Sequence, residues 1–189
     1  MKNKPSINLA LLHYPCVNSC GDKVATAAFP LDAQDIARSC ATFGVKNFFI
    51  VHPFQKQRNF LKDVVDFWNL EKAWQKNESR SIALSRVKVF ESLEAVIESL
   101  NSPIIISTSA SKQSKNIINF AQLVKLNESN VGKDYLIIMG TGSGLHSSIF
   151  EKSDYQLTPL EGTDRYNHLS VRSAAAIILF KINEALRAL

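Results

Sequence analysis

The stretch YLIIMGTGSGLHSS, Tyr135 to Ser148, joins a run typical of a buried strand to a glycine-rich loop. The loop contains Gly140, Gly142 and Gly144, and glycines allow a backbone to approach a ligand closely. In the common dinucleotide-binding folds, such a loop follows the first strand of the domain. Here it lies in the last third of the chain. The stretch therefore predicts a cofactor site in an α/β fold with an unusual chain order.

Further apolar runs predict the other strands of the sheet. Several are continuous rather than alternating, as in strands that are buried on both faces of a parallel sheet. Helical spacings separate these runs, so the sequence predicts an α/β protein with a mainly parallel sheet flanked by helices. The predicted strands are 7–14, 47–53, 87–91, 103–110, 135–141 and 155–160, and the predicted helices are 32–43, 60–74, 92–100, 117–124 and 170–186.

The composition is that of an ordinary globular chain. Its 189 residues are 46% hydrophobic and 21% charged, which argues against disorder and fits a single domain over residues 1–189. No apolar stretch approaches the roughly 20 residues of a membrane span. Three cysteines at irregular spacing argue against a disulfide framework. We therefore expect a cytoplasmic protein without a membrane partner, and its formal charge of +5 permits a nucleic-acid partner.

Three segments at predicted strand ends form the candidate site. Ser107–Ala110 ends one strand with small hydroxyl residues, 140–145 ends the next, and 157–174 runs from the last strand into the final helix. Ligands of open parallel sheets bind in the crevice outside the carboxyl ends of the strands. Each segment alone is a weak signal, because a strand end, a glycine turn and a helix cap would look similar. Their succession at three strand ends predicts one shared site.

This order resembles the SPOUT class of S-adenosylmethionine-dependent RNA methyltransferases, whose C-terminal part is tied in a trefoil knot. In that class three late loops hold the cofactor, and they match Thr108–Ser109, Gly140–Leu145 and Leu160–Ser170. The segments LLHYPCVN, ATAAFPLDAQDIARSCATFGV, GTGSGL and YNHLSVRSAAAIIL are together similar to a bacterial SPOUT group. Its members stand alone or are fused behind tRNA guanine-N1 methyltransferase.

The resemblance implies a cofactor, a substrate class and a set of site residues. We expect S-adenosyl-L-methionine as cofactor, tRNA or rRNA as substrate, and a homodimer that pairs through the final helix. The implied cofactor-binding residues are Thr108, Ser109, Gly140, Thr141, Gly142, Leu145, Pro159, Leu160, Tyr166, Asn167, His168, Leu169 and Val171.

A motif in the first long helix supplies the candidate catalytic residue. Many ribose-methylating members carry N-x5-R followed by F-G-V, and here Asp32 and Arg38 have this separation before Phe43-Gly44-Val45. Arg38 is expected to orient a phosphate or hydroxyl of the target, since guanidinium binds such oxygens in a fixed fork. A solvated arginine on the polar side of the helix is the alternative. Because Asp32 replaces the usual asparagine, and Tyr166–Ser170 departs from the ribose-methylating pattern, methylation of a base stays open.

Other functions are also compatible with parts of the sequence. A non-catalytic RNA-binding or cofactor-sensing module would keep the same fold. A nicotinamide-dependent oxidoreductase could use GTGSG, but no acidic residue ends another strand about 20 positions later. His13, Cys16 and Cys20 have a spacing found in zinc sites, but a second pair of ligands is missing, so no metal is expected.

Overall fold

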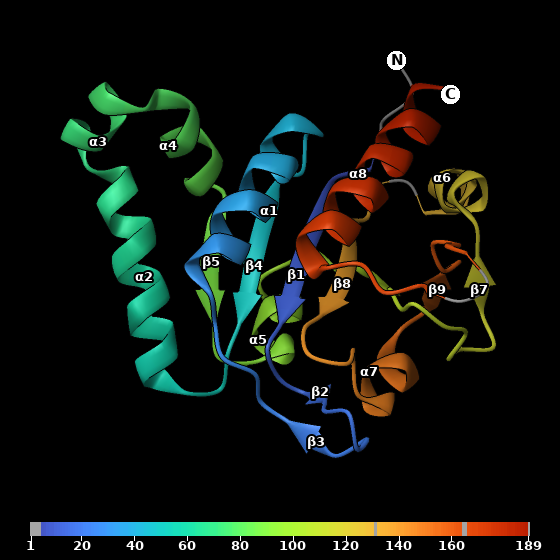
Figure 1. The fold of residues 1–189 in the computed structure, drawn as a ribbon. Helices are drawn as coiled ribbons and strands as arrows, with labels where there is room; N and C mark the ends of the chain where they lie inside the picture. Colours follow the sequence, from blue (N-terminus) through green and yellow to red (C-terminus); the bar gives the residue numbers. More distant parts are fainter. Residues whose placement is uncertain (1–4, 131, 164–165, 189) are drawn as a thin grey trace.

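A parallel sheet of seven strands forms the centre of the molecule (Figure 1). The computed structural model describes residues 5–130, 132–163 and 166–188. The strand order is β5-β4-β1-β8-β6-β9-β7, and every pairing in the described sheet is parallel. The strands are β1 (Ile7–Leu12), β4 (Asn47–Val51), β5 (Val87–Phe90), β6 (Ile104–Ser107), β7 (Ile117–Ile118), β8 (Tyr135–Gly140) and β9 (Tyr155–Leu157), with a separate antiparallel pair of β2 (Cys16–Val17) and β3 (Lys23–Val24). The predicted α/β fold with a mainly parallel sheet is confirmed.

The two central strands, β1 and β8, are buried along almost their whole length. This burial is what their continuous apolar runs predicted. Asn8 is the polar exception in β1, and its side chain donates to the Tyr135 carbonyl at 3.3 Å and accepts from Asn47 at 2.8 Å. The register sets Leu12 beside Gly140, which aligns the carboxyl ends of both strands.

Helices cover both faces of the sheet. α1 (Pro30–Thr42) and α8 (Val171–Arg187) lie side by side (Figure 1) and share one hydrophobic core with the strands. α5 (Leu93–Glu98) and α7 (Ser147–Lys152) pack into a second core on the opposite face. The other helices of the described chain are α2 (Gln55–Asn69), α3 (Glu71–Lys76), α4 (Glu78–Leu84) and α6 (Phe120–Ser129).

Several predicted helix boundaries are wrong. The first long helix was predicted to begin at Asp32, but it begins at Pro30 after Phe29, because proline fits the first helical position. It ends before Gly44, as predicted, where φ is +72°. The predicted helix 60–74 is two helices, α2 and α3, which break at Leu70 in an extended conformation.

The segment 117–124 was predicted to be a helix, but Ile117 and Ile118 form β7 at the edge of the sheet. Asn119 then caps α6 through a reciprocal capping box with Gln122. The short helices α4 and α7 were not predicted, because a segment of six or seven residues gives little periodic signal.

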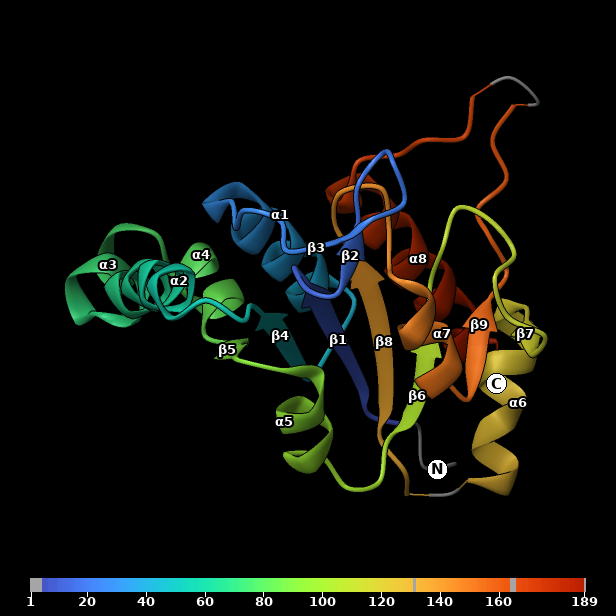
Figure 2. The ribbon, with the colours of Figure 1, turned by 90° about the horizontal axis from the view of Figure 1, so that it is seen from below.

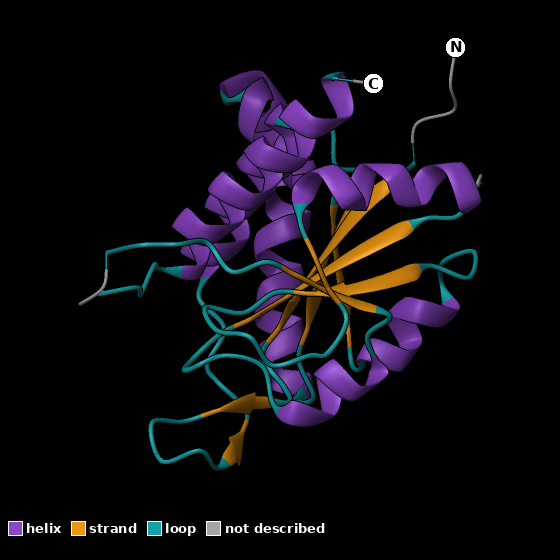
Figure 3. Cartoon of the chain, turned by 90° about the vertical axis from the view of Figure 1, so that its right-hand side faces the viewer, coloured by secondary structure: helices purple, strands orange, loops and turns teal. Residues whose placement is uncertain are grey.

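The strand β9 lies between β6 and β7, although it follows both in the chain. The connection 108–116 between β6 and β7 must therefore cross β9. The loops that follow β1, β6, β8 and β9 lie beyond the same ends of the strands (Figure 2). Figure 3 shows these loops gathered at one side, with the short β2–β3 pair beside them.

Candidate active site

A cavity of about 1070 Å³ opens among the loops at the carboxyl edge of the sheet. All three predicted segments line it, together with the segment that joins β1 to α1. Of the predicted cofactor-binding residues, its walls contain Thr108, Ser109, Gly140, Thr141, Gly142, Leu145, Leu160, Asn167, His168, Leu169 and Val171. These residues are spread over more than 60 positions of sequence, and the fold brings them to one place.

Two predicted cofactor-binding residues lie elsewhere. Pro159 and Tyr166 line a second cavity, of about 610 Å³, between the same C-terminal loop and the helices α6 and α8. Tyr166 is 69% exposed, so its ring is open to solvent or to a partner. Part of the predicted loop 160–170, residues 164 and 165, lies outside the described residues.

The glycines of the loop are required for packing within the chain itself. A Cβ at Gly140 would lie 2.8 Å from Leu145 Cδ2 and 2.9 Å from the Leu145 backbone nitrogen. Gly142 has a φ of +63°, and a Cβ there would lie 3.0 Å from the Val17 carbonyl oxygen and 3.1 Å from Thr26 Cγ2. From the sequence alone, these glycines were predicted to make space for a cofactor. The structure adds a nearer reason, which is close contact with Leu145 and with the segment after β1.

The segment between β1 and α1 holds the glycine loop and forms a wall that the sequence argument missed. Val17 donates its N–H to the Gly144 carbonyl at 3.0 Å, and Ser143 donates its N–H to the Val17 carbonyl at 3.0 Å. The lining residues of this wall are Val17, Gly21, Thr26, Ala27 and Phe29, and Asp32 in the first turn of α1 continues it. Its small residues and absence of periodicity gave no signal of a binding role.

Thr141 connects the glycine loop to this wall through its side chain. Its hydroxyl donates to the Leu12 carbonyl at 3.1 Å and makes a short hydrogen bond with the Thr26 hydroxyl. The Cys16 thiol lies 3.6 Å from the same hydroxyl and donates to the Leu12 carbonyl at 3.2 Å. The glycine loop is therefore fixed at the end of β1 by both backbone and side-chain hydrogen bonds.

Two buried histidines lie behind Thr26. His13 Nδ1 is 3.0 Å from the Thr26 hydroxyl, and His52 Nε2 is 3.0 Å from the Thr26 carbonyl oxygen. Because His52 Nδ1 accepts the N–H of Phe54, its Nε2 carries the proton and donates to that carbonyl. Burial, and then the neighbouring His52, lower the pKa of His13 to about 4, and burial is also the main cause that lowers the pKa of His52. Both rings are therefore neutral near pH 7.

The loop that follows Thr108–Ser109 is ordered by a buried side chain that was not singled out from the sequence. Gln156 of β9 is fully buried, and its Oε1 accepts the N–H groups of Gln113 and Ser114 at 2.9 and 2.7 Å. Its Nε2 donates to the Ser111 carbonyl at 2.7 Å. Thr108 is fixed separately, because its hydroxyl donates to the Ile138 carbonyl at 2.9 Å. Gln156 thus determines the course of the loop that crosses over it.

The C-terminal loop reaches back to the same segment. Asn167 donates its side-chain N–H to the Ala110 carbonyl at 3.3 Å, and the His168 ring packs edge-on against Tyr166 with centroids 5.5 Å apart. Ser170 then caps α8 by accepting the N–H of Ser173. This loop closes the cavity on the side of α8.

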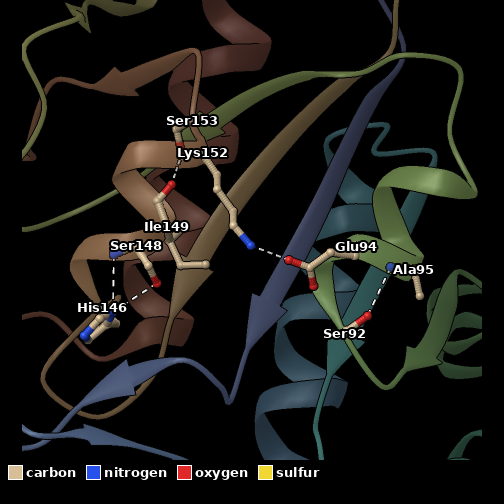
Figure 4. A network of polar contacts seen from close by, with 8 residues as sticks. All are labelled: Ser92, Glu94, Ala95, His146, Ser148, Ile149, Lys152 and Ser153. Atoms are coloured by element: carbon tan, nitrogen blue, oxygen red, sulfur yellow. Dashed lines mark hydrogen bonds and ion pairs between the residues drawn. The ribbon is translucent and has the colours of Figure 1, made fainter.

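A third histidine lines the cavity at the start of α7. His146 Nδ1 accepts the N–H of Ser148 and so caps the helix (Figure 4). At the other end of α7, Lys152 forms an ion pair with Glu94 of α5, and this hydrogen bond is the main cause that lowers the pKa of Glu94. These contacts fix α7 beneath the glycine loop.

Asp32 and Arg172 join the starts of α1 and α8 at the cavity wall. Arg172 Nε lies 3.5 Å from Asp32 Oδ1, and Arg172 Nη1 lies 3.7 Å from Asp35 Oδ2. Arg38, the predicted catalytic residue, is exposed on α1 and lines neither of the cavities described above. Within one chain it does not meet the predicted cofactor loops.

The described residues contain no group of three histidine, cysteine or acidic side chains that could hold a metal ion. Cys20 is exposed, whereas Cys16 is buried beside Thr141. No helix among the residues described has the length and hydrophobicity that crossing a bilayer requires.

The fold and the cavity define an α/β protein that binds a cofactor at the carboxyl edge of its sheet. The model of the SAM-dependent RNA methyltransferase family matches residues 6–184. The chain belongs to this family, and its resemblance to the SPOUT methyltransferases is confirmed. S-adenosylmethionine is the cofactor, and the nicotinamide alternative is set aside.

Individual relatives agree with this family. A tRNA (guanine-N(1)-)-methyltransferase of Nitratidesulfovibrio vulgaris is 37% identical over 96% of the chain, but the chain spans only 43% of that protein. An uncharacterized protein of Aquifex aeolicus is 30% identical over 94% of the chain and 88% of its own length. The crystal structure of a probable methyltransferase from Bordetella pertussis covers 96% of both chains with a TM-score of 0.64 at 16% identity, which is a likeness of fold.

The residues of the cavity suit S-adenosylmethionine. Its volume is at the upper end of the range for small-molecule sites, and its walls combine leucine side chains with exposed backbone of the glycine loop. Leu145, Leu160 and Leu169 would contact the adenine and ribose, and backbone groups of 140–144 would bind their polar edges.

Proposed function

We propose that the protein is a cytoplasmic methyltransferase that transfers a methyl group from S-adenosylmethionine to tRNA or rRNA. The observation that supports this most directly is the meeting of the three predicted loops in one cavity beside the end of β1. The acceptor is a ribose 2′-hydroxyl or a base nitrogen. Three free cysteines, two of them buried, agree with a reducing compartment.

Methyl transfer mainly requires the protein to position the cofactor and the acceptor. The bound cofactor supplies an activated methyl group on a sulfonium, so little acid–base machinery is needed beyond removal of one proton from the acceptor. The chain's own residues bind the adenosine part, exclude water through the leucines, and orient the acceptor. A cavity larger than the cofactor alone leaves room for part of a nucleotide.

The active form in this proposal is a homodimer that pairs through α8. Four apolar residues of α8, Ala175, Ile178, Leu179 and Ile182, are buried in the chain's own core and cannot supply this interface. Ile177 and Phe180 are 37% and 46% exposed, and they supply the apolar surface for pairing. Arg38 would then act on the partner's cavity, which agrees with its exposed position outside its own.

The proposal includes the trefoil knot of the SPOUT class. Support comes from the placement of β9 between β6 and β7, and from the hydrogen bonds of Gln156 to the loop above it. The chain would thread beneath the loop 108–116 on its way to α8. The whole of 1–189 would form one domain around this knot.

Three experiments test the proposal. Titration calorimetry should detect binding of S-adenosylmethionine and of its demethylated product, and light scattering should give a dimer mass at micromolar concentration. Nucleoside mass spectrometry of RNA from a deletion strain should show one missing methylated nucleoside, which the purified protein restores. Binding of the cofactor without methylation of tRNA or rRNA would instead identify a non-catalytic, cofactor-sensing module.

A further inference from the structure

We propose that Asp32 is the residue that accepts the proton of the RNA nucleophile during methyl transfer. The proposal rests on the proposed function, because it requires an RNA hydroxyl or ring nitrogen that loses a proton when it is methylated. Asp32 lies in the first turn of α1 and lines the same cavity as the predicted cofactor loops. Among the described residues that line this cavity, it has the only acidic side chain.

The position of Asp32 is fixed by an arginine that it shares with a neighbouring carboxylate. Arg172 reaches from α8 to Asp32 at 3.5 Å and to Asp35 at 3.7 Å. The two carboxylates differ in their surroundings: the Asp32 side chain is 15% exposed, whereas that of Asp35 is 48% exposed. Asp35 does not line the cavity. The same cation therefore holds one carboxylate toward the cavity and one toward solvent.

The remaining ionisable groups of the cavity are less suited to this task. His146 Nδ1 accepts the N–H of Ser148 and caps α7, so that nitrogen is not available as a base. His168 is exposed and lies against Tyr166 in the C-terminal loop. Asp32 combines a shielded position with a fixed geometry.

The surroundings of Asp32 also favour proton uptake. Burial raises its pKa above that of an exposed aspartate, Arg172 on α8 opposes this rise, and Asp35 on α1 adds to it. Arg172 and Asp35 are the charged groups of the described chain that act on it. A carboxylate whose pKa is raised is a stronger proton acceptor.

The proton balance of the step is simple. The acceptor atom of RNA uses an electron pair to form its bond to the methyl carbon, and the electrons of the broken carbon–sulfur bond stay with the cofactor. The acceptor's own O–H or N–H becomes strongly acidic as this bond forms, and its proton passes to a carboxylate oxygen of Asp32. No oxidant or further reactant is needed.

Comparing Asp32→Asn with Asp35→Asn tests this role, because both variants lose one carboxylate of the Arg172 pair. Single-turnover methylation should fall about a hundredfold or more in Asp32→Asn and stay near wild type in Asp35→Asn. Binding of the demethylated cofactor, measured by calorimetry, should change less than about threefold in both. Asp32→Glu should recover part of the rate, because it restores a carboxylate.

Carbon-13 NMR of aspartate carboxyls gives a readout that does not depend on activity. In the cofactor-free protein, the Asp32 carboxyl should titrate at a higher pH than an exposed aspartate, and its titration should move to still higher pH when Arg172→Met removes the cation. Full activity of Asp32→Asn, or equal losses in both variants, would overturn the proposal and leave the proposed function intact. A wild-type protein that methylates no RNA would contradict both the proposed function and the role of Asp32.

Discussion

Replacing Gln156 by leucine removes the side chain that orders the loop 108–116 above β9. Gln156 makes three hydrogen bonds to that loop, two to backbone N–H groups and one to a carbonyl. Each such bond contributes about 1 kcal/mol net to the free energy of unfolding. Leucine fills a similar volume, so the loss is at most about 3 kcal/mol. Ser111 and Gln113 are exposed, and water can reach their freed groups. We therefore expect Gln156→Leu to reduce the free energy of unfolding by an amount near the lower end of about 2–3 kcal/mol.

The loss should appear in cofactor binding as well as in stability. Ser109, Ala110, Ser111 and Gln113 all line the large cavity, so a loosened loop must be ordered again when the cofactor binds. A cost of about 1.4 kcal/mol corresponds to a tenfold change in affinity. Gln156→Leu should thus weaken binding of the demethylated cofactor by at least about tenfold in calorimetry, and urea unfolding should show the stability loss.

Two further variants separate this effect from a general loss of glutamine. Gln75→Leu changes an exposed glutamine on α3, which does not line the cavity. It should leave both the cofactor affinity and the free energy of unfolding unchanged. Gln156→Glu retains an acceptor for the two N–H groups but loses the donor to Ser111 when ionised, so its affinity should improve as the pH is lowered. Cofactor affinity of Gln156→Leu within twofold of wild type would refute the reasoning.

Three more predictions concern the glycine loop, the histidine pair and the dimer. Gly140→Ala should destabilise the protein by about 1–3 kcal/mol in urea unfolding, because its Cβ would lie 2.8 Å from Leu145; an unchanged midpoint would contradict that contact. Since the pKa of His13 falls from 6.5 to about 4 on folding, its neutral form stabilises the fold fully above pH 6.5, and this contribution of about 3 kcal/mol is lost as the pH falls toward 4. His13→Asn should flatten the pH dependence of the unfolding free energy over that range, and a slope equal to wild type would exclude His13 as its cause. Arg38→Ala should leave cofactor affinity unchanged and slow methyl transfer about a hundredfold, with partial recovery in Arg38→Lys; full activity would make it a solvated surface residue.

The parts of the fold that could be predicted are those with strong local patterns. The central strands β1 and β8 were recognised because strands covered on both faces need continuous apolar runs. The candidate site was recognised because glycines and small hydroxyl residues follow such runs directly. In contrast, β7 has only two residues, and its pairing with β9 depends on contacts far away in the chain.

The missed parts of the site depend on tertiary packing rather than on residue type. Gln156 is a single polar residue in a short strand, and only the crossing of the loop above it makes its side chain necessary. Thr26 lies in a segment without regular pattern, yet its hydroxyl connects Thr141 to His13. Sequence spacing cannot show such connections. Thr26 and Thr141 are 115 residues apart, and the contact of Thr26 with His13 joins two different residue types.

The position of β8 between β1 and β6 has a consequence for the newly made protein. One edge of β1 finds its partner only when residues 135–140 have been synthesised, and until then a buried, apolar strand has an open edge. The chain must be synthesised through α8, which ends at Arg187, before β9 and α8 complete the cavity. Truncated nascent chains that end before residue 135 should therefore remain sensitive to protease and prone to aggregate, and the cofactor should protect only chains that extend through α8.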